Sequence, residues 1–299
     1  MITEKKRNDD AVVVANVCEK GGVGKTTTSL ALAACFVDEG YKTLLVDYDP
    51  QNSTTSCLGY GVEDKDYDGP ITEEMLLQDD PETYGISILM EDSLLRMPEM
   101  DWHELVIHTR EGYDLIPASI ELAKTESKMR NTDQCRKSEE VLKRALRRIR
   151  KEYDFIIIDC APTLSMLFTN VITAADKVII PISPEQSAIR GFVLLYREIH
   201  EAKELLNPEI EIAGVLITKA RDQANIIKDN IGRIRKLSGT VNVFEDVIPL
   251  GIKDAEEATK NNTSLIGLYH STRRPSPVLT KIAEAYKKVA KEIIDGSNY

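Results

Sequence analysis

The chain carries the stretch Glu19-Lys20-Gly21-Gly22-Val23-Gly24-Lys25-Thr26-Thr27, which Cys18 joins to Ala11–Val17, an apolar run of strand length. An apolar helical pattern, Leu30–Val37, follows the stretch. A strand, a glycine-rich turn, a Lys-Thr pair and a helix together form the context of a phosphate-binding loop. Glycines let backbone N–H groups converge on phosphate oxygens, and the start of the helix adds the positive end of its dipole. We therefore expect Lys25 to reach the β- and γ-phosphates of a nucleotide and the Thr26 hydroxyl to bind Mg²⁺.

This loop departs from the usual G-x-x-x-x-G-K-T pattern at its first position, where the chain has Glu19. It contains Lys20 and the pair Gly21-Gly22 instead. A chance glycine turn that opens a helix is the alternative, but the flanking strand and the flanking helix both agree with a phosphate loop.

Short β-branched runs alternate with longer helical patterns along the rest of the chain. Most of these runs are continuously apolar, as expected for strands that are buried on both faces. The alternation predicts an α/β fold, namely a doubly wound, mainly parallel sheet with helices on both faces. The predicted strands are Ala11–Val17, Thr43–Asp47, Tyr113–Ile116, Phe155–Asp159, Lys177–Ile182, Ile212–Thr218 and Val243–Ile248.

One helical pattern is especially clear, because its apolar and basic residues separate onto two faces. The apolar stripe consists of Val141, Leu142, Ala145, Leu146 and Ile149, with Lys143, Arg144, Arg147 and Arg148 mostly opposite.

The 299 residues are interpreted as a single domain, because no linker-like composition separates two halves. Residues 60–110 are the irregular part, with turn-forming pairs that include Asp80-Pro81 and Met97-Pro98. We expect this part to be an elaboration of the domain.

The composition, with 42% hydrophobic and 29% charged residues, is that of an ordinary globular protein. No apolar run approaches the roughly 18 residues of a membrane span. The N-terminal segment Met1–Asp10 is polar, so we expect a cytoplasmic location. The five cysteines form no C-x-x-C pair, which argues against a zinc site and against a secreted disulfide framework.

The net charge of −11 counts against a constitutively basic nucleic-acid binder. This average hides an asymmetry. Between Glu63 and Asp101 acidic residues greatly outnumber basic ones, whereas the balance reverses between Lys124 and Lys151. A locally basic face on an acidic protein therefore remains open.

The segment Lys20–Thr27 resembles the deviant Walker A motif of the ParA/MinD class of P-loop ATPases. In that class the extra lysine, which matches Lys20, crosses a nucleotide-sandwiched dimer interface to the partner's phosphates. A lysine supplied in trans makes physical sense, because positioned cations must neutralise charge on the transferring phosphoryl oxygens. The resemblance implies ATP, Mg²⁺ and a homodimer. Its nucleotide-binding residues would be Lys20, Gly21, Gly22, Val23, Gly24, Lys25, Thr26 and Thr27.

Two further segments narrow the resemblance to the ParA/Soj branch. Leu44–Gln51 is similar to the D-x-D-P-Q switch segment, which implies that Asp49 orients the attacking water and that Asp47 lies near the outer shell of the metal. Tyr153–Pro162 resembles the Walker B strand and second switch, which implies that Asp159 holds Mg²⁺ through water. Taken alone, an aspartate at a strand end is often only a turn residue.

The resemblance continues through Asp114–Ala118, Gly214–Thr218 and Val247–Pro249 to the final helix, and it adds Pro249 to the nucleotide-binding residues. The chain departs from the family's motifs at two places. The family's Gln-Gly-Asn after the switch is Gln51-Asn52-Ser53 in this chain, and its paired prolines after Walker B are Ala161-Pro162.

Members of this branch bind DNA without sequence preference in the ATP-bound dimer, through basic residues late in the chain. Of two arginines typical of the family, one aligns with Gln223 and the other with Lys253, and a lysine can contact phosphate as a point charge. The remaining candidates for a phosphate-contacting strip are Arg221, Lys228, Arg233, Arg235 and Lys236. The alternative is a solvated helix face, and the same ambiguity holds for the basic helix around Lys143–Lys151.

The resemblance thus implies an ATPase that dimerises around ATP and Mg²⁺, hydrolyses ATP slowly and drives the partition of a plasmid or chromosome. A ParB-like partner would stimulate hydrolysis, and DNA binding would place the protein at the nucleoid. The main alternative is a ParA-like ATPase that positions a protein assembly.

A MinD-like membrane ATPase is a second alternative, but the apolar stripe in Lys281–Ile294 is explained more economically by packing on the sheet. A cluster-bridging iron–sulfur reductase would use Cys135 and Cys160, and Cys160 directly follows the Walker B strand. A ligase of the dethiobiotin-synthetase type has no reason to carry Lys20 together with Asp47–Gln51.

Overall fold

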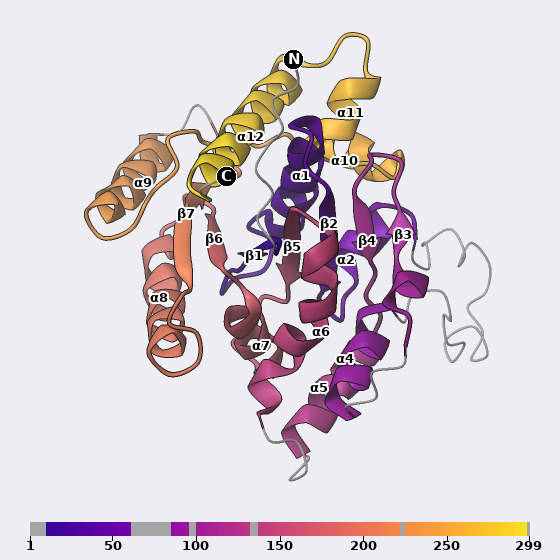
Figure 1. The fold of residues 1–299 in the computed structure, drawn as a ribbon. Coiled ribbons are helices and arrows are strands. Elements are labelled where there is room, and N and C mark those ends of the chain that lie inside the picture. Colours follow the sequence, from indigo (N-terminus) through magenta and orange to yellow (C-terminus); the bar gives the residue numbers. More distant parts are fainter. Residues whose placement is uncertain (1–9, 61–84, 96–99, 132–136, 222–224, 298–299) are drawn as a thin grey trace, which may run out of the picture.

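The computed structural model describes residues 10–60, 85–95, 100–131, 137–221 and 225–297, and its centre is a seven-stranded sheet (Figure 1). The strand order is β3-β4-β2-β5-β1-β6-β7, and every neighbouring pair is parallel except β3 with β4. The α/β fold predicted from the alternating pattern, with a mainly parallel sheet, is therefore confirmed. The strands are β1 (Val12–Asn16), β2 (Thr43–Tyr48), β3 (Ile107–His108), β4 (Asp114–Ile116), β5 (Phe155–Cys160), β6 (Lys177–Ile182) and β7 (Glu211–Ile217).

Helices cover both faces of the sheet, so alternate residues of a strand enter two different cores. Val13 and Ala15 of β1 pack with α4 to α8, whereas Val12 and Val14 pack with α1, α10, α11 and α12. The helices are α1 (Lys25–Asp38), α2 (Ser53–Cys57), α4 (Gly85–Leu95), α5 (Glu121–Asn131), α6 (Val141–Ile149), α7 (Met166–Ala174), α8 (Ala188–Leu205), α9 (Asn225–Arg235), α10 (Ile252–Lys260), α11 (Leu265–Ser271) and α12 (Pro277–Asp295). Short 3₁₀ turns are η3 (Trp102–Leu105), η4 (Ser138–Glu140), η5 (Arg150–Glu152) and η6 (Lys236–Gly239).

The register of the central strands determines where the polar strand ends meet. All residues of β5 are buried, and β5 pairs in parallel with both β1 and β2. Asp159 near the end of β5 is opposite Asn16 of β1 and Asp47 of β2. Because carboxyl ends of parallel strands share one edge of a sheet, this register brings Asp47 and Asp159 to the phosphate loop.

The amphipathic pattern of α6 is matched by the structure. All five residues of its apolar stripe are buried, while Lys143, Arg147 and Arg148 are exposed.

Within the interval 60–110, which we expected to be irregular, the described residues contain α4, η3 and β3. Helix α4 buries Ile86, Leu89 and Met90 in the core.

The predicted strand Val243–Ile248 is wrong. This segment runs beside β7 but makes only isolated bridges, such as Val215 with Val243. The guanidinium of Arg235 donates hydrogen bonds to the carbonyl oxygens of Val243, Phe244 and Glu245. These carbonyls are therefore engaged by a side chain rather than by a continuous strand ladder.

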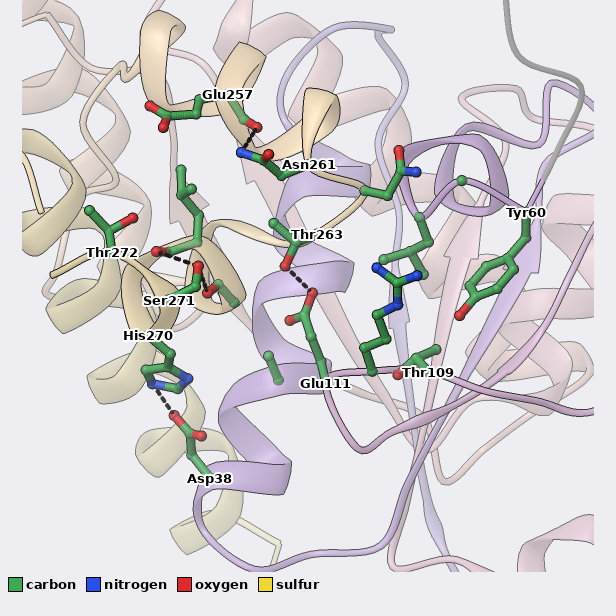
Figure 2. A pocket seen from close by; sticks show the side chains of 17 residues that line it. Asp38, Tyr60, Thr109, Glu111, Glu257, Asn261, Thr263, His270, Ser271 and Thr272 are labelled. Atoms are coloured by element: carbon green, nitrogen blue, oxygen red, sulfur yellow. Dashed lines mark hydrogen bonds and ion pairs between the residues drawn. The ribbon is translucent and has the colours of Figure 1, made fainter. Parts of the chain in front are cut away.

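A polar cavity of about 830 Å³ lies between the end of α1, the turn from β3 to β4, and helices α10 and α11 (Figure 2). Glu111 in that turn accepts hydrogen bonds from Thr263 Oγ1 at 2.7 Å, from the Ser264 N–H at 2.6 Å and from the Ser264 hydroxyl. Ser264 in turn caps α11 by accepting from the Gly267 N–H at 3.0 Å. Glu111 thus fastens the hairpin turn to the start of α11.

Replacing this carboxylate tests its structural role. We expect Glu111→Ala to lower the free energy of unfolding by about 2–3 kcal/mol, because buried Ser264 loses a charged acceptor. Urea denaturation of the nucleotide-free protein measures the change. Arg110→Ala, at the exposed neighbouring position, is the matched control and should shift stability by no more than about 0.5 kcal/mol. Equal urea midpoints for Glu111→Ala and the wild type would contradict this role.

Candidate nucleotide site

The phosphate loop connects β1 to α1 and owes its shape to two left-handed glycines. Gly22 has φ +77° and Gly24 has φ +87°, a region that glycine enters without steric cost. Gly24 is the N-cap of α1 and directly precedes its first residue, Lys25. No atom lies within 4 Å of the β-carbon positions of Gly21 and Gly22, so a ligand can approach the backbone of the loop closely.

Lys25, the first residue of α1, forms a buried ion pair at the end of β5. Its ammonium lies 3.0 Å from Asp159 Oδ1 and 4.0 Å from Asp49 Oδ2. Only 7% of the Lys25 side chain and none of the Asp159 side chain are exposed. Burial acts to lower the pKa of Lys25. The negative charge of Asp159, together with smaller contributions from other groups, acts in the opposite direction and is stronger. The pKa of Lys25 is therefore raised, and the ammonium stays charged.

Three hydroxyl groups surround Asp159. Thr26 Oγ1 and Thr54 Oγ1 donate to Oδ2 at 2.8 and 2.7 Å, and Ser29 Oγ donates to Oδ1 at 3.0 Å. The predicted metal-binding residues Thr26 and Asp159 are therefore in direct contact. A hydroxyl and a carboxylate are the hard oxygen donors that Mg²⁺ prefers, so this donor set fits the ion.

Two further carboxylates come from the segment after β2. Asp47 is fully buried and accepts from the Thr55 N–H at 2.9 Å and from Thr55 Oγ1 at 2.8 Å. Burial, and next the charge of Asp159, raise the pKa of Asp47 to about 7 against the opposing effect of the Thr55 hydrogen bonds. Asp49, whose side chain is 8% exposed, accepts from the Gln51 N–H at 2.9 Å. The structure thus brings Lys25, Thr26, Asp47, Asp49 and Asp159 together.

Sequence reasoning missed three residues of this centre, Ser29, Thr54 and Thr55. The run Ser53-Thr54-Thr55 directly after the switch segment was the available signal. The departure at Asn52 has a local explanation. Asn52 has φ +44°, a left-handed conformation that asparagine tolerates better than most residues and that glycine, the family's residue there, adopts freely.

Lys20 lies apart from this buried centre. It pairs with Glu185, just before α8, and both side chains are more than half exposed. The hydrogen bond from Lys20 is the main reason that the pKa of Glu185 is lowered. Exposed ion pairs contribute at most about 1 kcal/mol, so Lys20 can be released at small cost.

Pro249 is held close to the loop by a chain of contacts. Thr218 Oγ1 donates to the carbonyl oxygen of Val23 at 2.6 Å, and two residues later Ala220 pairs with Pro249 in a parallel bridge. The structure therefore places the turn around Pro249 next to the strand end that supports the phosphate loop.

The candidate DNA-contacting residues separate into two groups. Arg235 is half-buried and donates to three backbone carbonyls, so its visible contacts are structural. Gln223 lies outside the described residues. The exposed cations come from the segment after β7, from α9 and η6, and from the start of α10; they are Arg221, Lys228, Arg233, Lys236 and Lys253.

The structure bears on two alternative functions, the MinD-like membrane ATPase and the iron–sulfur reductase. Helix α12 packs beside α1 (Figure 1). Its apolar stripe is buried, and the Tyr286 hydroxyl lies 3.0 Å from Thr28 Oγ1. Among the described residues, no helix combines the length and apolar character that crossing a bilayer requires. Cys160 is fully buried, and its partner in the iron–sulfur hypothesis, Cys135, lies outside the described residues. The described part of the chain contains no cluster of three or more metal-binding His, Cys, Asp or Glu side chains.

A strand, glycine loop and helix, with the loop lysine paired to a carboxylate at the end of β5, define a P-loop ATPase. The AAA domain family AAA_31 matches residues 11–212. Soj of Bacillus subtilis is 35% identical over 282 residues, which cover 94% of this chain and 97% of Soj. The chromosome partitioning protein ParA of Caulobacter vibrioides is 31% identical over 284 residues, 94% of this chain and 93% of ParA. The chain belongs to the ParA/Soj family of P-loop ATPases.

Solved structures agree with this fold. The cobyrinic acid a,c-diamide synthase of Mycobacterium smegmatis, with bound ADP and magnesium, has a TM-score of 0.71 and 28% identity, covering 96% of this chain and 95% of that one. A plasmid partition protein of Borrelia burgdorferi bound to AMPPNP has a TM-score of 0.69 and 21% identity, covering 96% and 99%, which shows the fold alone.

Removal of the buried lysine tests the site. We expect Lys25→Ala to reduce ATP hydrolysis at least about 100-fold, because it removes the principal cation at the transferring phosphate. Phosphate release measures the rate, and circular dichroism verifies that the variant is folded. Lys143→Ala, on the exposed face of α6, is the matched control and should keep the wild-type rate. Wild-type hydrolysis by Lys25→Ala would show that the nucleotide binds elsewhere.

Proposed function

We propose that this chain is a partition ATPase that dimerises around ATP and Mg²⁺ and uses hydrolysis to switch its affinity for DNA. The observation that carries the proposal is the pair of lysines in one loop. Lys25 is buried against Asp159, whereas Lys20 stands exposed on the surface of the same loop. One lysine is thus fixed beside the phosphate site of its own chain, and the other is available to a second copy.

Within one subunit, each polar group has a role that follows from its position. Lys25 would neutralise charge on the β- and γ-phosphates, and Pro249 would contact the nucleotide. Thr26 and Asp159 would hold Mg²⁺, with Asp47 behind them, and the metal when bound neutralises phosphate oxygens. Asp49 would orient the attacking water, because its carboxylate lies at the same edge of the sheet and beside Lys25. The ADP and magnesium bound to the M. smegmatis relative support a nucleotide and Mg²⁺ as the ligands of this site.

Dimerisation would depend on Lys20 exchanging one anionic partner for another. Within the subunit, Lys20 is neutralised by Glu185. A partner's phosphates carry more negative charge than one carboxylate, and exposed ion pairs are weak, so the exchange is favourable once ATP is bound. ATP would therefore act as part of the interface.

DNA binding would use the exposed cations of α9, η6 and the start of α10. The chain's net charge of −11 opposes DNA binding by a single subunit, and a dimer would align two such patches. A partition role is supported by the relatives, including the Myxococcus xanthus chromosome partitioning protein ParA, 35% identical over 238 residues, 80% of this chain and 75% of that protein. A ParB-like partner would stimulate hydrolysis.

Two substitutions separate hydrolysis from dimerisation. We expect Asp49→Ala to bind ATP, to hydrolyse it about 100-fold more slowly and to accumulate as a dimer, because the attacking water is no longer oriented. Lys20→Ala should bind ATP and stay monomeric. Light scattering with saturating ATP and Mg²⁺ measures both states. A monomeric Asp49→Ala protein with bound ATP would rule out the trapping mechanism.

Charge reversal tests the DNA surface. Arg233→Glu combined with Lys236→Glu should weaken ATP-dependent binding to non-specific duplex DNA and leave basal hydrolysis near wild type. Neutralising a single contacting lysine should lower the slope of log affinity against log salt by about 1. Gel shifts with and without ATP measure binding. Lys143→Glu with Arg147→Glu, on the exposed face of α6, is the matched control. If protein that dimerises binds no DNA at about 50 mM salt, where phosphate contacts are strong, the cargo is a protein assembly instead.

A further inference from the structure

Asn16, the last residue of β1, is a polar side chain at a position where the alternation of the strand predicts an apolar one. Val12 and Val14 pack into the core under α1, and the two-residue period of a strand puts Asn16 on the same face. Asn16 is fully buried, and its register partner in β5 is Asp159. A buried amide therefore lies beside the carboxylate at the centre of the nucleotide site.

The amide of Asn16 is connected to Asp159 through one hydroxyl group. Asn16 Nδ2 donates to Ser29 Oγ at 2.8 Å, and Ser29 Oγ donates to Asp159 Oδ1 at 3.0 Å. The same hydroxyl has a second acceptor, because the carbonyl oxygen of Lys25, one helical turn earlier in α1, lies 3.2 Å away. A serine hydroxyl carries a single proton, so these two acceptors compete for it.

The hydrogen bond from Asn16 favours Asp159 in this competition. A hydroxyl that accepts from an amide becomes a stronger donor, because successive hydrogen bonds polarise one another. The carboxylate of Asp159 is the charged acceptor and also the nearer one, so it gains more from a stronger donor than the Lys25 carbonyl does. Asn16 thus helps to hold Ser29 on Asp159.

The other end of the Asn16 amide has no such contact. Asn16 Oδ1 is buried and accepts no hydrogen bond from any residue that the structure describes. A buried polar atom without a partner is unfavourable, so an apolar side chain of the same shape would serve the folded state equally well or better. The contribution of Asn16 is therefore to be sought at the site and not in stability.

The bond from Ser29 gains importance when a nucleotide binds. Asp159 Oδ1 has two donors, the Lys25 ammonium at 3.0 Å and the Ser29 hydroxyl. Lys25 is also the cation that would neutralise the β- and γ-phosphates, and an ammonium shared with phosphates interacts less with Asp159. Ser29 is then the donor that keeps Oδ1 directed toward α1, while Oδ2 stays beside Thr26.

We propose that Asn16 is a positioning residue for Mg²⁺, which acts through Ser29 on the carboxylate of Asp159. The inference rests on the proposed function, because there Thr26 and Asp159 hold the metal. Asn16 is not a ligand in this proposal. It fixes the orientation of Asp159, and partners behind a metal ligand raise the affinity of a site for its ion.

The experiment separates metal binding from nucleotide binding and from folding. Calorimetry measures the dissociation constant of ADP without Mg²⁺, and then that of Mg²⁺ titrated into the equimolar complex of protein and ADP. Asn16→Leu replaces the amide with an apolar side chain of the same shape. It should raise the Mg²⁺ dissociation constant about 10-fold and change the ADP constant less than about 2-fold, because only the partner behind the metal ligand is lost. Its midpoint in urea denaturation should not fall below that of the wild type, because the unpartnered acceptor is removed as well.

A second substitution tests the connection through the hydroxyl. Ser29→Ala should weaken Mg²⁺ binding at least as much as Asn16→Leu does. The double variant should bind Mg²⁺ no more weakly than Ser29→Ala alone, because the amide acts only through this hydroxyl.

Asn207→Leu is the matched control, since Asn207 is another buried amide. Its Nδ2 donates to the carbonyl oxygens of Ile172 and Ala175 at 2.8 and 2.7 Å, before the amino ends of β6 and β7. This amide is structural, so its loss should lower the urea midpoint and leave the Mg²⁺ dissociation constant unchanged.

The inference is overturned if Asn16→Leu binds Mg²⁺ as the wild type does, if it weakens ADP as much as Mg²⁺, or if the two single effects multiply in the double variant. Asn16→Val, the residue type at positions 12 to 14 of β1, takes its place should Asn16→Leu fail to fold. If neither folds, the amide is structural and the inference is wrong. A wild-type complex with ADP that binds no Mg²⁺ would overturn the proposed metal site as well, whereas normal Mg²⁺ binding by both the wild type and Asn16→Leu overturns this inference alone.

Discussion

The ion pair between Lys25 and Asp159 is the contact around which the rest of the site is organised. Asp159 has no exposed side-chain surface, and an isolated buried carboxylate is costly. Lys25 and the hydroxyls of Thr26, Ser29 and Thr54 offset that cost, and they come from α1 and α2. A buried ion pair adds little net stability over an apolar replacement. The fold therefore supports this centre through the register of β5 with its neighbours, and the centre supplies function rather than stability.

The two lysines of the loop differ because their surroundings differ. Lys25 is enclosed by strand ends and is held in one position, whereas Lys20 is more than half exposed and is held by one exposed carboxylate. A fixed cation suits a phosphate that always occupies the same place. A lysine in a weak, reversible ion pair is suited to leaving one anion for another.

The local part of this structure was predictable from the sequence, and the tertiary part was not. The phosphate loop, the parallel sheet and the buried stripe of α6 follow from periodicity and from the neighbours of each residue. Thr54 reaches Asp159 only because β2 and β5 are adjacent, which no short pattern encodes, whereas Thr55 contacts Asp47 within its own β2–α2 segment. Arg235 was grouped with the DNA-contacting cations because charge is visible in a sequence, whereas its carbonyl partners eight to ten residues later are not. The same three carbonyls explain why Val243–Ile248 is not a strand.

The balance of charge at the carboxyl edge of the sheet favours a divalent cation. Asp49 and Asp159 share the ammonium of Lys25, and the buried Asp47 is opposite Asp159 in the sheet, so carboxylates outnumber ammonium groups at this edge. Burial and the charge of Asp159 raise the pKa of Asp47 to about 7, which means that ionised Asp47 is destabilised in this arrangement. A cation next to these carboxylates would lower that pKa again, because opposite charge stabilises the ionised form. Affinity for a metal and the protonation of Asp47 are therefore linked, and acidification should weaken Mg²⁺ binding as pH falls through about 7.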